Sequence, residues 1–451
     1  CRKPVRQTLT MAKKVNVITM GCSKNLVDSE RVIKMLGNAG LEAVHDADDF
    51  SGGAVVINTC GFIGDAKEES VNAILEACQA KADGVVDSVY VMGCLSERYR
   101  AVLPDEIPEV DGWFGKFDWK DVVAALTSRP ASVQRDAREW DRELTTPSHH
   151  AYLKIAEGCN RMCAFCAIPI ITGRYHSRPI DEVLEEVREL VGRGVKEFNV
   201  IAQDLSNYGR DLPRNPGDRN HLALLLEKMS EIEGVEWIRL HYAYPADFPY
   251  EILPVMASRD NICKYLDIAL QHIDDGVLAN MHRHIDSKAT VELLERLRRE
   301  VPGIHIRTTL MVGFPGETEE AFERLEEFVR EQRFDRMGAF AYCEEEDTRA
   351  AREFSDDIPD DVKQSRLDRI MAIQEEIALE LNEAKIGQTL RVVIDSENDE
   401  YYVGRTQYDS PEVDPEVLVR KSATLKKGMF YNVKITDAYP FELVGEIVDT
   451  K

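Results

Sequence analysis

Short apolar runs alternate with helical patterns along most of this chain, and the alternation limits the folds that it can adopt. Such a pattern predicts parallel sheets, because two parallel strands need a long crossover connection, usually a helix. In the first part of the chain it predicts a doubly wound α/β domain. The strands expected there are Val15–Thr19, Ala54–Thr59 and Ser88–Met92, and the helices Asp28–Ala39, Glu68–Ala80 and Ser96–Leu103.

A polar stretch with Pro130 and Pro147 interrupts this pattern and predicts a linker, and a second alternating series starts at Ala151. Six strand candidates follow, with helical patterns such as Ile180–Val191 between them. Six βα units are too few for a closed eight-stranded barrel, so we expect an open, TIM-like (βα)6 barrel. Its expected strands are Tyr152–Ala156, Glu197–Ala202, Glu236–His241, Tyr265–Leu270, Ile304–Val312 and Met337–Tyr342.

The last part of the chain follows a long amphipathic pattern, Pro359–Ala384, which Gly387 ends. Five short strand-like runs then predict a small antiparallel, OB-like β-barrel. These runs are Leu390–Ile394, Tyr401–Arg405, Glu416–Val419, Tyr431–Ile435 and Leu443–Ile447. We therefore expect an α/β multidomain chain with an N-terminal domain, a linker, a partial barrel and a small β-barrel over residues 11–130, 131–150, 151–385 and 386–451.

The composition of the chain indicates the cellular compartment and the kind of partner to expect. Ten cysteines in 451 residues lack the spacing of a secreted disulfide framework, and favour a reducing cytoplasm with cysteines kept for metal binding. No apolar run approaches the length of a membrane span, and we expect a monomer. The net charge of −25 disfavours bulk nucleic acid as the main partner and favours a basic macromolecule. Met11 is a candidate start, with residues 1–10 as an upstream extension.

Cys159, Cys163 and Cys166 form a C-x3-C-x2-C motif after the first expected barrel strand. Barrel enzymes build their sites on loops at the C-terminal ends of strands. Three thiolates are one ligand short of a closed zinc site, whereas an iron–sulfur cubane held by three thiolates keeps one iron open to a small molecule. A zinc site with a distant fourth ligand is the alternative. We expect Phe165 in this loop to shield the cluster and to abut a bound nucleobase.

Cys22, Cys60 and Cys94 each follow a different expected strand of the N-terminal domain, and each adjoins a glycine. In a parallel sheet these thiols emerge at one edge, where open α/β sheets bind ligands. Neighbouring glycines let the backbone approach a bulky ligand. We therefore expect a second three-thiolate cluster, with ordinary buried cysteines as the alternative. Core packing is the better explanation for the cysteines that lack this placement, Cys78, Cys263 and Cys343.

The two cysteine sets together resemble those of a known family. The triplet is similar to the radical S-adenosylmethionine (AdoMet) signature, and the dispersed set to the ligands of the methylthiotransferase domain. The segment from Gly387 resembles a TRAM domain, and the likeness covers nearly the whole chain after Met11. Two residues depart from the family pattern: Asp347 stands where glycine is usual, and Ala269 where proline is usual.

Within this family, three runs are more similar to the ribosomal-protein branch, RimO, than to the transfer-RNA branch: Ala167–Arg174, Ile201–Asp204 and Gly404–Asp414. The last run is acidic where a transfer-RNA binder is expected to be basic. From Gly387 to Lys451 there are twelve Asp or Glu against eight Lys or Arg. This balance is expected to repel phosphates and to attract a basic ribosomal protein, with an ordinary solvated acidic face as the alternative.

The resemblance implies an enzyme that places a methylthio group on the β-carbon of one aspartate in small-subunit ribosomal protein S-twelve. It implies two 4Fe–4S clusters, one on each cysteine set, and an electron donor such as a flavodoxin. The triplet's cluster binds AdoMet and yields a deoxyadenosyl radical, and the second cluster carries the sulfur. Cofactors supply this chemistry, because no side-chain base can remove a hydrogen from an unactivated carbon at neutral pH.

Weaker expectations concern the AdoMet contacts. Side chains at the ends of barrel strands are candidates, with rim packing as the alternative. Lys154 and Arg174 either meet the AdoMet carboxylate or pair with Glu157. The candidate contacts are Gln203, His241, Gln271 and Gly313, together with Phe165.

Three other functions stay open. A transfer-RNA adenosine methylthiotransferase would need a basic groove, built from dispersed residues such as Arg174, Arg178, Arg283 and Arg307. An iron–sulfur carrier or redox protein would not cleave AdoMet. A structural zinc protein would bind no iron.

Overall fold

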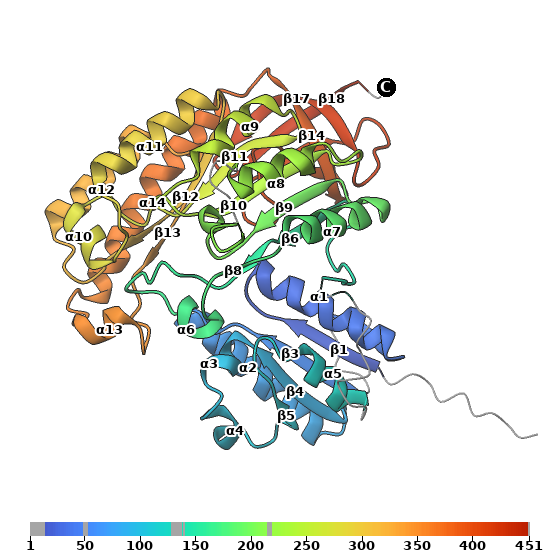
Figure 1. Cartoon of the computed structure of the whole chain (residues 1–451). Coiled ribbons are helices and arrows are strands. Elements are labelled where there is room, and N and C mark those ends of the chain that lie inside the picture. Colours follow the sequence, from blue (N-terminus) through green and yellow to red (C-terminus); the bar gives the residue numbers. More distant parts are fainter. Residues whose placement is uncertain (1–13, 48–52, 128–137, 139, 214–218, 450–451) are drawn as a thin grey trace, which may run out of the picture. The chain divides into compact units, whose positions relative to one another are not determined.

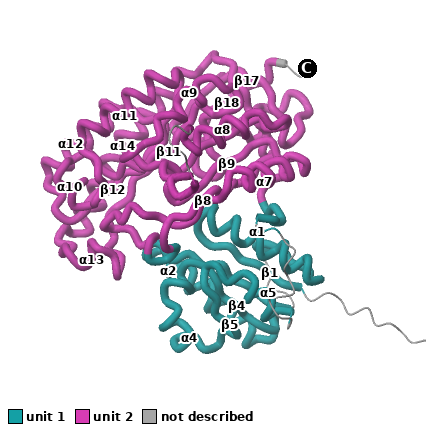
Figure 2. The backbone as a smooth tube through the Cα atoms, viewed as in Figure 1, with its two compact units in different colours: residues 1–145, 170–172 teal, residues 146–169, 173–451 magenta. Residues whose placement is uncertain are grey.

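The chain divides into two compact units, which Figure 2 colours separately: unit 1 within residues 1–145 and 170–172, and unit 2 within residues 146–169 and 173–451. Among the described residues, no helix combines the length and the apolar character that a membrane crossing requires. The computed structural model describes residues 14–47, 53–127, 138, 140–213 and 219–449.

Unit 1 is built on a sheet of five parallel strands in the order β2-β1-β3-β4-β5 (Figure 1). This confirms the predicted doubly wound sheet and its three central strands. The two edge strands, β2 and β5, are short and only partly buried, so no apolar run in the sequence predicted them. The strands are β1 (Lys14–Thr19), β2 (Glu42–His45), β3 (Ala54–Thr59), β4 (Ser88–Gly93) and β5 (Gly112–Trp113).

Helices cover both faces of this sheet. In β3, Val56 packs in the cluster that includes α1 and α5, whereas Ile57 packs in the cluster that includes α2 and α3. Successive side chains of a strand point to opposite faces, so a strand covered on both sides is apolar throughout. The helices of unit 1 are α1 (Ser23–Asn38), α2 (Gly64–Ala82), α3 (Cys94–Arg98), α4 (Leu103–Glu106) and α5 (Trp119–Thr127).

Two regions of unit 1 differ from the sequence prediction. The single helix expected over Ser96–Leu103 is wrong: α3 ends at Arg98 and α4 begins at Leu103. The expected linker lies partly outside the described residues, and its later part packs within unit 1. There Arg142 forms an ion pair with Glu30, and both side chains are about 1% exposed. A polar run can therefore hide a buried charge pair as well as a linker.

Unit 2 contains the predicted open barrel of six parallel strands, in the order β6-β9-β10-β11-β12-β13. Helices connect the strands and cover their outer side (Figure 1). The strands are β6 (His150–Lys154), β9 (Glu197–Ile201), β10 (Trp237–Ala243), β11 (Ile262–Ile268), β12 (His305–Val312) and β13 (Arg336–Ala341). The longer helices are α7 (Ile180–Gly192), α8 (His221–Ser230), α11 (Ser287–Glu300), α12 (Glu319–Gln332) and α14 (Asp360–Glu383).

The C-terminal strands form the expected small barrel, closed in the order β14-β15-β16-β18-β17. The predicted antiparallel barrel is confirmed in four of its five strand pairs, and the fifth pair, β16 with β18, runs parallel. Strand directions cannot alternate around a closed ring of five, so one pair has to run parallel. The strands are β14 (Thr389–Glu397), β15 (Tyr401–Thr406), β16 (Glu416–Arg420), β17 (Phe430–Tyr439) and β18 (Glu442–Asp449).

The loop between β15 and β16 contacts the N-terminal ends of the open barrel's strands. Arg336, the first residue of β13, donates to Asp409 at 2.6 Å, and Arg307 of β12 contacts Asp414 at 3.3 Å. Asp409 is 1% exposed. These two carboxylates are therefore used inside the molecule and are not available to a basic partner. The small barrel covers one end of the open barrel, and the cysteine triplet lies at the other.

Candidate active site

The cysteine triplet lies on the loop after β6, at the C-terminal end of the open barrel, as predicted. Gly158 precedes it with φ +82, and a Cβ there would lie 2.2 Å from the carbonyl oxygen of Arg174, so only glycine fits. Within the triplet, the backbone N–H of Ala164 donates to Met281 O at 2.9 Å, and its carbonyl accepts from Ala350 N at 2.7 Å. The loop is thus held by two other segments of unit 2.

Burial raises the pKa values of two thiols in this loop, those of Cys159 and Cys166. Burial raises the pKa of Cys159 to about 11, and burial together with nearby Cys163 raises the pKa of Cys166. Iron and zinc bind the thiolate, so metal binding must displace these protons. Among the described residues no three His, Cys, Asp or Glu side chains converge on one point.

The dispersed cysteines meet at one edge of the unit 1 sheet. Cys22 lies between β1 and α1, Cys60 directly follows β3, and Cys94 begins α3 after β4. A Cβ on Gly21 would lie 2.8 Å from Cys60 Sγ, so the first two loops touch. The order of strands reverses between β1 and β3, and ligands of such sheets bind at this switch point.

The electrostatics of this edge also show that the thiols are close. Burial raises the pKa of Cys94 to about 12, against the opposing effect of Lys116 and with further contributions from Cys22 and Cys60. Burial raises the pKa of Cys60 as well. The Cys94 thiol donates to Asn25 Oδ1 at 3.4 Å. Three thiols within electrostatic reach of one another fit the predicted second cluster.

Buried polar atoms without hydrogen-bond partners lie just after β9, just after β11 and within β9. The unpartnered atoms, among the described residues, include Gln203 Oε1, Gln271 Oε1 and Asn199 Nδ2. Such atoms are costly unless a ligand or water satisfies them. The residues therefore fit a polar ligand such as AdoMet. Asn199 was missed by sequence reasoning because it lies inside the apolar run of β9 and has no motif around it.

Two candidate contacts have packing roles in the structure. His241 lies within β10, not at its end, and its Nε2 lies 3.3 Å from the hydroxyl oxygen of Ser410 in the small-barrel loop. The Phe165 ring meets Phe314 edge-on with centroids 6.4 Å apart. Their contacts with AdoMet stay predictions.

The loop that follows β12 is held by one buried carboxylate. Glu317 accepts from the backbone N–H of Gly313 at 3.0 Å and from Arg366 at 2.7 Å, and lies 3.2 Å from His272 Nε2. Sequence reasoning identified Gly313 but missed the role of Glu317, because His272 and Arg366 come from distant segments. Gly313 itself has φ +74, and a Cβ there would lie 2.4 Å from Lys363 Cγ. The structure thus explains this glycine by packing against α14.

Replacing Gly313 by alanine tests that explanation. We expect Gly313→Ala to lower the free energy of unfolding by about 2–5 kcal/mol, because a left-handed L-residue costs about 1–2 kcal/mol and overpacking about 1–3 kcal/mol. Urea denaturation of Gly313→Ala, with Lys363→Ala added to relieve the crowding, measures the effect. Partial recovery in the double variant supports packing, and weaker AdoMet binding at unchanged stability contradicts it.

The structure does not assemble the basic groove that the transfer-RNA alternative requires. Arg178 pairs with Glu186 at 2.6 Å, Arg307 is paired as described above, and Arg283 is buried. Arg174 is exposed. Lys154 pairs with Glu157 at 2.7 Å, which supports ion pairing over a contact with the AdoMet carboxylate.

Left-handed backbone collects around the same end of the barrel. Asp347, which stands where the family usually has glycine, has φ +63 and therefore keeps the conformation that glycine favours. Other non-glycine residues with positive φ lie in the cysteine loop, in or just after barrel strands, and after helix α10 (Asp275–Asn280). Such strain persists only where the surroundings impose it, and it clusters at functional sites. These residues are Met162, Tyr242, Asp247, Gln271, His282 and His284.

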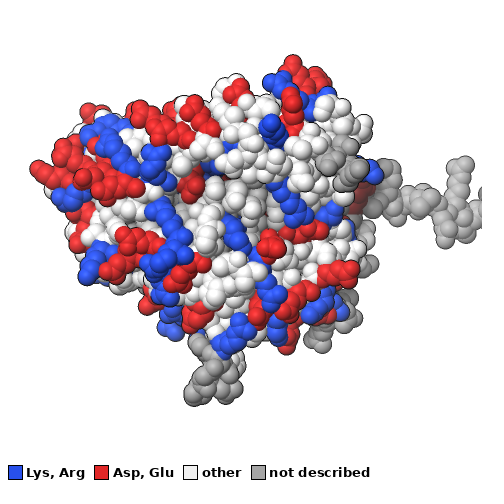
Figure 3. All heavy atoms as spheres, turned by 90° about the horizontal axis from the view of Figure 1, so that it is seen from above, with Lys and Arg blue, Asp and Glu red and all other residues white. Residues whose placement is uncertain are grey.

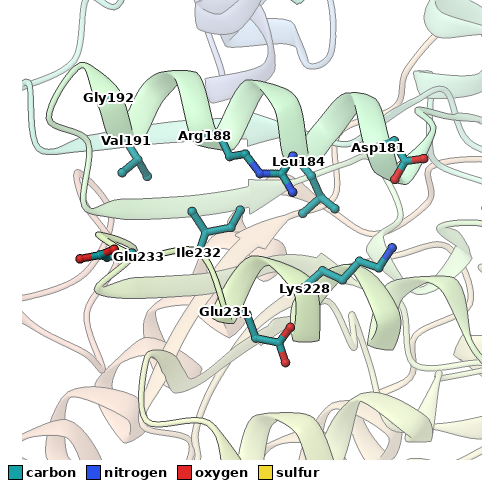
Figure 4. A pocket seen from close by; sticks show the side chains of 9 residues that line it. All are labelled: Asp181, Leu184, Arg188, Val191, Gly192, Lys228, Glu231, Ile232 and Glu233. Atoms are coloured by element: carbon teal, nitrogen blue, oxygen red, sulfur yellow. The ribbon is translucent and has the colours of Figure 1, made fainter.

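A groove on the outer side of the barrel is separate from these features. Figure 4 shows it between α7 and α8, with Leu184 and Ile232 on its walls and charged side chains such as Arg188 and Glu231 around it. None of the predicted site residues lines it.

Comparison with known proteins agrees with this geometry. Family models match three segments: the radical SAM superfamily over residues 153–329, the TRAM domain over 386–448, and the uncharacterized protein family UPF0004 over 14–115. Radical S-adenosylmethionine methyltransferase TsrM from Kitasatospora setae aligns with a TM-score of 0.55 at 16% identity, over 73% of this chain and 75% of that one. At that identity the likeness shows the fold alone.

Curated relatives match along almost the whole chain. The ribosomal protein uS12 methylthiotransferase RimO of Bacteroides fragilis is 57% identical over 437 residues, which cover 97% of this chain and 99% of that protein. The protein of the same name from Flavobacterium johnsoniae is 50% identical, over 96% of this chain and 98% of its own. This chain therefore belongs to the RimO family of methylthiotransferases.

Proposed function

We propose that this protein is a radical AdoMet methylthiotransferase that modifies the β-carbon of an aspartate in ribosomal protein uS12. One observation carries the proposal: the chain holds two separate sets of three thiols, one at the C-terminal end of a radical SAM barrel and one at the switch point of an α/β sheet. The full-length identity to RimO proteins supports the same substrate.

Each cysteine set has a different task in this proposal. Cys159, Cys163 and Cys166 hold one 4Fe–4S cluster, and Cys22, Cys60 and Cys94 hold the other. When bound, the clusters and AdoMet supply radical generation and the sulfur. The chain orients AdoMet through three amide atoms that have no hydrogen-bond partner, Gln203 Oε1, Gln271 Oε1 and Asn199 Nδ2. The small barrel excludes water from the opposite end of the open barrel.

The partner is a basic protein surface, and the acids that attract it are exposed ones. The face in Figure 3 shows charges of both signs interleaved, with no broad basic area that would suit RNA. We propose that the small barrel contributes through its exposed carboxylates, since complementary charge speeds encounter. We further propose a single-electron donor such as a flavodoxin, a monomer, and the cytoplasm as location. The exposed acids include Glu397, Asp399, Glu400, Asp437 and Glu442.

Anaerobic turnover tests this function directly. The reconstituted protein is incubated with AdoMet, a low-potential reductant and uS12, and in parallel with unmodified transfer RNA. We expect about eight irons per chain, matching two cubanes, and a methylthio mass gain on one aspartate of uS12. Modification of adenosine in transfer RNA without any gain on uS12 would reject the proposal in favour of the sister activity. Iron without AdoMet cleavage would indicate a carrier, and zinc without iron a structural protein.

A further inference from the structure

The guanidinium of Arg283 lies against the cysteine triplet. Arg283 is 3% exposed, and its NH1 donates to Cys163 Sγ at 3.3 Å. Its NH2 donates to the backbone carbonyl of Ala269, and its Nε has no hydrogen-bond partner among the described residues. A buried cation is costly unless its donors meet acceptors or opposite charge. Donor capacity therefore remains here for an anionic group.

An aromatic ring holds this guanidinium in place. The Arg283 guanidinium lies 4.1 Å from the ring centroid of Tyr244, and that of Arg161 lies 4.3 Å from the same centroid. The Tyr244 hydroxyl donates to the backbone carbonyl of Arg283 at 2.8 Å. Arg161 is neutralised by Asp204 at 2.6 Å. In the described part of the chain no carboxylate lies within ion-pair distance of Arg283. Its positive charge is therefore available to interact with the cysteine loop.

The backbone around Arg283 is bent to bring it to this position. His282 and His284 on either side have φ +57 and +54, which costs an L-residue about 1–2 kcal/mol each. The same segment accepts from the cysteine loop, through the bond from Ala164 N to Met281 O at 2.9 Å. A strained segment that is tied to the cysteine loop and presents one buried cation to it has the features of a functional contact.

We propose that Arg283 is a positioning residue that raises the reduction potential of the cluster held by the triplet, an inference that rests on the proposed function. A hydrogen bond to a ligating sulfur and a nearby positive charge both stabilise the reduced cluster, because it carries one more negative charge. The step is the transfer of one electron from a low-potential donor to the cluster, and no bond forms or breaks in it. The positive charge of the guanidinium keeps the cluster reducible.

Potentiometric titration followed by electron paramagnetic resonance tests this role. The full-length wild type is compared with Arg283→Gln, Arg283→Lys and Arg349→Gln after anaerobic reconstitution. Arg349→Gln is the matched control, because this substitution removes one positive charge beside His282 at a residue that does not contact Cys163. For the AdoMet-responsive cluster, we expect Arg283→Gln to lower the equilibrium constant for reduction at least tenfold, about 59 mV for one electron. Arg283→Lys is expected to lower this equilibrium constant less, and Arg349→Gln to leave it unchanged.

The second cluster serves as an internal standard, since its cysteines belong to unit 1 and Arg283 belongs to unit 2. Equal midpoints in wild type and Arg283→Gln, with full iron content in both, would overturn the inference. If Arg283→Gln binds no iron at the triplet, Arg283→Lys decides, and a wild-type midpoint there overturns it. Failure of AdoMet to change any wild-type signal would instead overturn the proposed function.

Discussion

Replacing Cys163 by alanine is expected to abolish AdoMet cleavage, whereas Cys60→Ala is expected to leave cleavage and abolish sulfur transfer. The reason is the separation of the two thiol sets into different units, each at its own sheet edge. Removing one of three thiolates leaves too few ligands for a cubane at the affected site. The other site keeps all three of its thiolates. Deoxyadenosine, methylthio-uS12 and iron per chain, measured in one anaerobic assay, report on both sites.

A third cysteine variant controls for general damage. Cys78 lies in α2 and packs in the core of unit 1, away from the switch-point edge. We expect Cys78→Ala to retain both products and about eight irons per chain, as two cubanes require. Equal activity of Cys163→Ala and Cys60→Ala in both assays would contradict the division of roles.

Replacing Asp409 by asparagine is expected to lower the free energy of unfolding of unit 2 by about 3–5 kcal/mol, the cost of leaving a buried charge unpaired. Asp409 accepts from Arg336 at 2.6 Å and from the Thr406 hydroxyl at 2.5 Å. Urea denaturation followed by tryptophan fluorescence measures the loss, since Trp237 packs on Phe430 of the small barrel with ring centroids 4.7 Å apart.

The same network predicts how stability depends on pH. Burial alone would raise the pKa of Asp409, but Arg336, Lys385 and hydrogen bonds from Thr406 hold it below its ordinary value. Carboxylates with a lowered folded pKa contribute stability that is complete above their unfolded pKa, about 4, and is lost as the pH falls through the folded pKa. Unit 2 should therefore lose stability below about pH 4, and Asp409→Asn should lose less over that range.

Asp399→Asn provides the matched control for this prediction. It removes the same charge from the same small barrel, but Asp399 is exposed. We expect a change within about 0.5 kcal/mol, as for most surface substitutions. An equally small effect of Asp409→Asn would show that the small barrel is not held by this buried pair.

The sequence alone determined the layout of this protein and the positions of its two cysteine sets in that layout. The period of apolar residues identified the α/β sheet, the six barrel strands and the small β-barrel, because burial of one or both strand faces leaves a pattern in neighbouring residues. The two cysteine sets were identifiable for a similar reason. Their spacing in the triplet, and their positions after strands in unit 1, follow from local chain geometry.

The tertiary structure alone decided which charges meet. Nothing local links Asp409 to Arg336, Glu317 to Arg366, or Arg283 to Cys163, since each pair is separated by dozens of residues. The acidic run in the small barrel looked like a binding surface because composition does not tell a solvated carboxylate from a buried one. Burial makes an unpaired charge costly, so each of these partners is chosen by the three-dimensional packing and leaves no signal in the order of residues.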